Sequence, residues 1–123
     1  MGALALAGFC LSRCKRNEEV YVRRVVGSVG AAQLVKDAAT LLSSTVELEE
    51  GRLPQNVPLP KSFQAFSPKY TLRFGAQFMI VTKTGFGEHK VGVAVEPVEH
   101  GEPKGIGQLT FKQIAPGVFC FEE

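Results

Sequence analysis

The sequence predicts an α+β fold, in which an N-terminal amphipathic helix, or two, packs on an antiparallel β-meander of three to four strands. Apolar residues recur with the period of a helix in the N-terminal part of the chain, whereas they alternate along strand-like runs from Tyr70 onwards. A stretch with three prolines, residues 51–62, separates the two parts. Helices that precede a run of strands are typical of α+β domains, because regular alternation of the two would instead predict a parallel sheet.

Size and composition predict one globular domain. The chain has 123 residues, of which 45% are apolar and 21% charged. Its net charge of +2 arises from 14 Lys and Arg against 12 Asp and Glu. The basic excess lies within residues 1–24, so the rest of the chain has no basic stripe of the kind that nucleic-acid-binding faces carry. Nucleic acid is therefore disfavoured as a partner.

Two N-terminal segments favour helices. Asn17 and the two glutamates after it are typical of a helix start, although the valine-rich stretch that follows also has the composition of a strand. The spacing of the valines favours a helix over a strand for residues 17–27. The second segment is clearly amphipathic, with its apolar face formed by Ala31, Leu34, Val35, Ala38, Leu41 and Leu42. Gly27 and Gly30 between the segments indicate a turn or a tolerated helix glycine rather than a phosphate-binding loop.

The second half of the chain is predicted to form antiparallel strands. Residues 51–62 are expected to be an extended connector, because the residue before a proline avoids helical backbone. Alternation then predicts one long strand over residues 70–83, bent at Gly75. Its first face is expected to hold Tyr70, Leu72, Phe74, Ala76, Phe78 and Ile80. A glycine-rich turn and a loop over residues 97–107 connect further strands, expected at residues 91–95, 109–112 and 118–121.

The long strand is apolar on both faces near its end. Met79 and Val81 alternate with the equally apolar Phe78 and Ile80. A single layer of helices covers only one face of a sheet, so the other face needs a second cover. Met79 and Val81 are therefore candidate residues of a sheet interface with another sheet, the N-terminal segment or another subunit.

Residues 1–16 form an apolar and basic segment ahead of the predicted domain, residues 17–123. The uncharged run over residues 2–11 is too short to span a bilayer, and it lacks the basic start and cleavage site of a secretory signal. It has two interpretations: a peripheral membrane anchor with acylated thiols and basic residues, or a segment packed against the domain or a neighbouring subunit. The candidate anchor or interaction residues are Leu4, Leu6, Phe9, Cys10, Cys14, Lys15 and Arg16.

No group of residues predicts a catalytic, cofactor or metal site. His89 and His100 lie in predicted loops without a neighbouring nucleophile. Three cysteines, two of them close together and without further ligands nearby, fit neither a zinc site nor a secreted disulfide scaffold. We therefore expect no cofactor, and an intracellular, reducing compartment, with membrane association if the N-terminal anchor forms.

These observations predict a non-enzymatic module that works through protein–protein contact, as a homo-oligomer or as an accessory subunit of a larger assembly. The alternative is a membrane-peripheral adaptor anchored through the N-terminal segment. A third hypothesis, a small-ligand or nucleic-acid binder that uses the phenylalanine-rich sheet, is weaker, because few cations accompany those phenylalanines.

Overall fold

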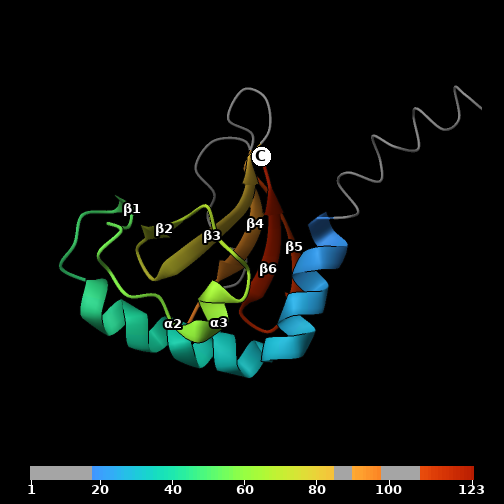
Figure 1. Ribbon diagram of the computed structural model, residues 1–123, viewed down its shortest axis with the longest axis horizontal. Coiled ribbons are helices and arrows are strands. Elements are labelled where there is room, and N and C mark those ends of the chain that lie inside the picture. Colours follow the sequence, from blue (N-terminus) through green and yellow to red (C-terminus); the bar gives the residue numbers. More distant parts are fainter. Residues whose placement is uncertain (1–17, 85–89, 98–108) are drawn as a thin grey trace, which may run out of the picture.

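The computed structural model describes residues 18–84, 90–97 and 109–123. In these residues, helices pack on a six-stranded antiparallel sheet, which confirms the α+β class (Figure 1). The helices are the N-terminal helix (Glu18–Val29), α2 (Ala31–Thr45) and the short α3 (Lys61–Gln64). The strands are β1 (Gly51–Arg52), β2 (Tyr70–Phe74), β3 (Gln77–Thr84), β4 (Lys90–Val95), β5 (Thr110–Ala115) and β6 (Val118–Glu122).

The N-terminal helix and α2 are joined by a sharp corner at Gly30. The backbone of Gly30 has a φ of 94°, in the left-handed region that favours glycine. The two helices consequently meet at 84° (Figure 1), and both pack on the same face of the sheet. Val22 and Val26 of the first helix are buried in the core, so the helical interpretation of the valine-rich stretch is confirmed.

The predicted long strand is wrong, because the chain turns back at Gly75. Two strands, β2 and β3, form a hairpin in which Phe74 pairs with Gln77 and Leu72 with Met79. Residues directly opposite each other in a hairpin share a face. The even-numbered residues of β2 therefore lie on the same face as the odd-numbered residues of β3. Tyr70, Leu72 and Phe74 therefore lie with Met79 and Val81, and not with Phe78 and Ile80 as the alternation indicated.

Buried Arg73 ties this turn to the loop after α2. Its guanidinium donates through Nη1 to the carbonyl oxygen of Gly75, at 2.8 Å, and through Nη2 to that of Leu48. The amide of Gly75 in turn donates to the Glu50 carboxylate, at 2.6 Å. The turn is thus tied to the loop after α2 in two ways, through Arg73 and through Glu50.

The strand order, β1-β2-β3-β4-β6-β5, departs from a simple meander. The chain follows a meander from β1 to β4, but β6 then lies beside β4 and β5 lies outside β6. The number of strands also exceeds the expected three to four. The additional ones arise from the split of the long strand and from Gly51–Arg52, which pairs with β2. The predicted extended connector ends earlier than expected, because Lys61 and Ser62 already belong to α3.

Apolar side chains form a cluster on each face of the sheet. The main core joins the helices to Phe78, Ile80, Val93, Val95, Val118 and Cys120. The second cluster, on the opposite face, consists of Met79, Val81, Ala94, Phe119 and Phe121. A rim of partly buried apolar residues packs against this second cluster: Tyr70, Leu72, Phe74, Leu109 and Phe111. None of the described helices contributes to the second cluster.

Gly92 permits the close approach of β3 and β4. A Cβ atom at this position would lie 1.9 Å from the carbonyl oxygen of Ile80 and 3.1 Å from the ring of Phe121. The obstacle on the β3 side is backbone, which cannot rotate away as a side chain can. The position therefore tolerates only glycine without a shift of the strands.

We expect Gly92→Ala to lower the free energy of unfolding by about 1–3 kcal/mol, the usual cost of overpacking a core. Urea denaturation of the full chain measures the loss. Gly27→Ala is the control, because Gly27 lies in a helix and a Cβ atom added there would meet nothing within 4 Å; it should stabilise the protein by about 0.5–1 kcal/mol. Equal urea midpoints for Gly92→Ala and the parent would contradict the close approach.

Candidate functional site

Residues 1–17 lie outside the described residues. The predicted anchor or interaction residues Leu4, Leu6, Phe9, Cys10, Cys14, Lys15 and Arg16 are among them, and His89 and His100 from the loops lie outside the described residues too. The described part of the chain begins with Glu18, which accepts a hydrogen bond from the Thr82 hydroxyl. The N-terminal helix thus lies beside the end of β3 at Glu18.

Met79 and Val81, the candidate sheet-interface residues, lie at the centre of the second cluster. Their side chains are 1% and 0% exposed, so solvent does not reach them. The apolar surface that is partly accessible on this face belongs to the rim of the second cluster. Sequence reasoning missed the contribution of β2 to this rim, because it depends on the turn at Gly75.

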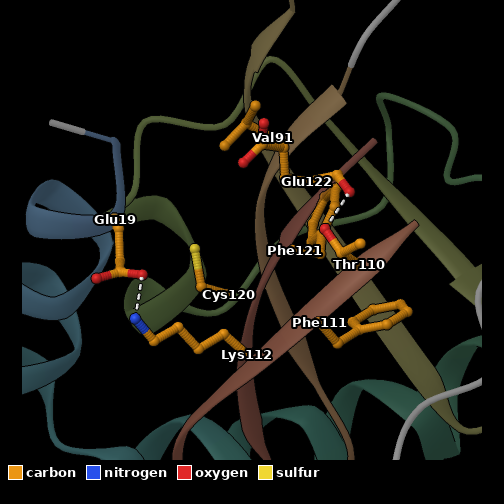
Figure 2. Close-up of a pocket in the computed structure, with 8 residues that line it drawn as sticks. All are labelled: Glu19, Val91, Thr110, Phe111, Lys112, Cys120, Phe121 and Glu122. Carbon is orange, nitrogen blue, oxygen red and sulfur yellow. Dashed lines mark hydrogen bonds and ion pairs between the residues drawn. The ribbon is translucent and has the colours of Figure 1, made fainter. Parts of the chain in front are cut away.

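A half-open hollow of about 240 Å³ lies between the N-terminal helix and the ends of β5 and β6 (Figure 2). It is lined by Glu19, Val91, Thr110, Phe111, Lys112, Cys120, Phe121 and Glu122. Figure 2 shows the Glu19 carboxylate reaching from the helix to the ammonium of Lys112, at 3.0 Å. The hydrogen bond from Lys112 lowers the pKa of Glu19, with smaller contributions from the charges of Lys112 and Arg23. This ion pair links the helix to the outermost strand.

The thiol of Cys120 lies in the same hollow but is a poor nucleophile. Burial, and secondarily the charges of Glu19 and Glu18, raise the pKa of Cys120 to about 11. A thiol is reactive as its thiolate, so this environment suppresses the reactivity of Cys120 near neutral pH. Over residues 18–84, 90–97 and 109–123, no cluster of His, Cys, Asp and Glu has the arrangement of a metal site.

The described sheet ends in two unequal edges. On one side, β1 has only two residues, whereas β5 on the other side has six and pairs with β6 alone among the described strands. Thr110, Lys112 and Gln113 are exposed along β5. The ring of half-buried Phe111 lies 6.4 Å from that of Phe121, between their centroids, at the end of the rim of the second cluster.

The sequence contains a signal for this edge. Residues 118–121 are apolar at every position, as in strands buried on both faces, whereas β5 mixes polar and apolar residues. That contrast places β6 inside the sheet and β5 outside it. The chain order alone suggested the reverse.

Comparisons of this chain with protein-family models, with curated proteins and with solved structures each found no match. Among the described helices, none is by itself long and apolar enough to cross a membrane; the N-terminal helix and α2 reach that length and composition only together, across the 84° bend.

We expect stability to fall as the pH rises from about 9, the ordinary pKa of cysteine, to about 11, its value for Cys120 in the folded chain. In this range the unfolded chain releases a proton that the folded chain retains, so deprotonation favours unfolding. Urea denaturation across the range, on a Cys10→Ser/Cys14→Ser chain, measures the fall. Adding Cys120→Ala should make the fall shallower; an unchanged slope would argue against the buried thiol.

Proposed function

We propose that this chain is a non-enzymatic protein–protein interaction module, acting as a homo-oligomer or as an accessory subunit of a larger assembly. The observation that carries the proposal is the rim of the second cluster. Its members are partly exposed on the sheet face opposite the described helices and form two strips: Tyr70, Leu72 and Phe74 on β2, and Leu109 and Phe111 at the β5 edge. A partly exposed apolar surface of this kind, bordered by polar residues, is typical of protein contacts.

The surroundings of the rim fit a contact surface. Exposed Thr110, Lys112 and Gln113 lie beside Phe111, so polar groups flank an aromatic residue at the sheet edge. Aromatic residues at the centre of an interface contribute most to binding, while the flanking polar residues exclude water. Phe111 is therefore the residue on which we expect association to depend.

Light scattering on a sizing column tests the proposal. The full chain is expected to be an oligomer, and Phe111→Glu to shift it to a monomer, because the substitution places a charge in the apolar contact. Ala39→Glu is the control, since Ala39 is exposed on α2, away from the rim; it should leave the oligomer intact.

Circular dichroism is needed to show that both variants fold like the parent chain. If the folded Phe111→Glu variant remains an oligomer, the rim of the second cluster is not part of the contact. A parent that is monomeric at every concentration tested would refute the homo-oligomeric form.

A second candidate function, a membrane-peripheral adaptor in a reducing intracellular compartment, is favoured by the N-terminal sequence. Cys10 and Cys14 lie beside Lys15 and Arg16 and next to an apolar run, a combination suited to acylation near an anionic surface. We expect Cys10→Ser/Cys14→Ser to move the protein from the membrane fraction to the soluble fraction of its own cells, with Cys120→Ser as the control. Unchanged partitioning of the double variant would eliminate this function.

A further inference from the structure

We propose that β5 pairs antiparallel with β5 of a second copy of this chain, so that the two sheets become one, with the two-fold axis passing at Phe111. This inference rests on the proposed function in its homo-oligomeric form, and it names the contact surface and the occupant. The long edge at β5, the faces of its side chains and the charge at Lys112 carry the argument.

The outer edge of β5 offers backbone groups for pairing. Among the described strands, β5 has a neighbour, β6, on one side only. The backbone amides and carbonyls on the other side form a template for an added strand, because a strand edge that stays unpaired presents a row of free donors and acceptors. The opposite edge, β1, is too short to act in the same way.

The two faces of the sheet restrict the register. Phe111 lies on the face of the second cluster, whereas Lys112 lies on the other face, beside Cys120 and within reach of Glu19. A two-fold axis perpendicular to the sheet keeps equivalent faces together. Because directly opposite residues share a face, one residue of β5 must then lie opposite the same residue of the second copy, and this residue is the centre of the pairing. The candidate centres are Thr110, Phe111, Lys112 and Gln113.

Phe111 is the centre that charge and pairing favour. A centre at Lys112 brings two ammonium groups directly opposite each other, which is destabilising. A centre at Gln113 extends the pairing into the bulge between Gln113 and Ala115. A centre at Thr110 pairs only residues 109–111 within the described chain, whereas a centre at Phe111 pairs residues 109–113.

The Phe111 register also forms favourable rows across the interface. On one face, the two Phe111 rings lie opposite each other, and each already packs near Phe121, so that the aromatic row continues from one sheet into the next. On the other face, Lys112 of the second copy lies opposite Thr110, which is itself opposite Glu122. The Glu19 carboxylate already offsets the charge of Lys112, which otherwise discourages strand pairing at an edge.

Disulfide cross-linking tests this register. In the proposed register, Thr110 of one copy lies directly opposite Lys112 of the other copy. The separation of their Cα atoms is about 4.5–5.5 Å, which a disulfide can bridge. We mix a tagged Thr110→Cys chain with an untagged Lys112→Cys chain and oxidise with diamide. Both are full-length chains in the Cys10→Ser/Cys14→Ser/Cys120→Ala background, because Cys120 lies directly opposite position 112 of the same chain and would otherwise compete for the disulfide. Positions 110 and 112 are exposed, so the cysteines introduced there spare the core.

The expected result is a disulfide-linked heterodimer as the main product. The control mixture, Thr110→Cys with Gln113→Cys, should yield much less, because these two side chains lie on opposite faces of the strand. Equal yields from the two mixtures, or no cross-link from a parent that light scattering shows to be an oligomer, would overturn the β5 pairing and leave the proposed function standing. A monomeric parent without cross-links would overturn both the β5 pairing and the homo-oligomeric form of the proposed function.

Discussion

The two-residue turn between β2 and β3 decides how the sheet divides its side chains between two faces. By pairing Phe74 with Gln77, it places the apolar residues of β2 on the same face as Met79 and Val81. It leaves Thr71 and Arg73 on the face of the main core, where both are buried. The guanidinium of Arg73 stabilises the same turn, because it donates hydrogen bonds to the carbonyl oxygens of Gly75 and Leu48. The contribution of β2 to the rim of the second cluster depends on this register.

The sheet is apolar on both faces, but the described helices cover only one of them. The N-terminal helix and α2, turned at Gly30, cover the main core, and the polar tie between Ser62 and Asp37, at 2.6 Å, holds α3 against α2. The opposite face has an equally buried centre but a rim that solvent partly reaches. Surface of this kind is where a contact with another protein yields the largest gain from apolar burial.

Local patterns in the sequence predicted the two long helices and most strand positions, but neither the short α3 nor how the strands pair. The helical period over residues 31–42 is a local property and was sufficient for α2. Gly75 and Ala76 do not form one of the turn pairs that signal a hairpin, so the alternation on both sides of them predicts a single strand. The strand order depends on contacts between distant residues, such as Val93 with Cys120. Likewise, the Glu19–Lys112 ion pair joins two segments whose proximity no local pattern reveals.

The position of β6 inside the sheet has a kinetic consequence. It is the last strand in chain order, yet within the described residues β5 pairs with it alone, and β4 depends on it for the pairing of its second edge. Contacts between residues far apart in sequence form slowly, because the loop between them must close first. Until β6 arrives, the long apolar edge of β4 is open to other chains, so folding of this protein is expected to compete with aggregation at that strand.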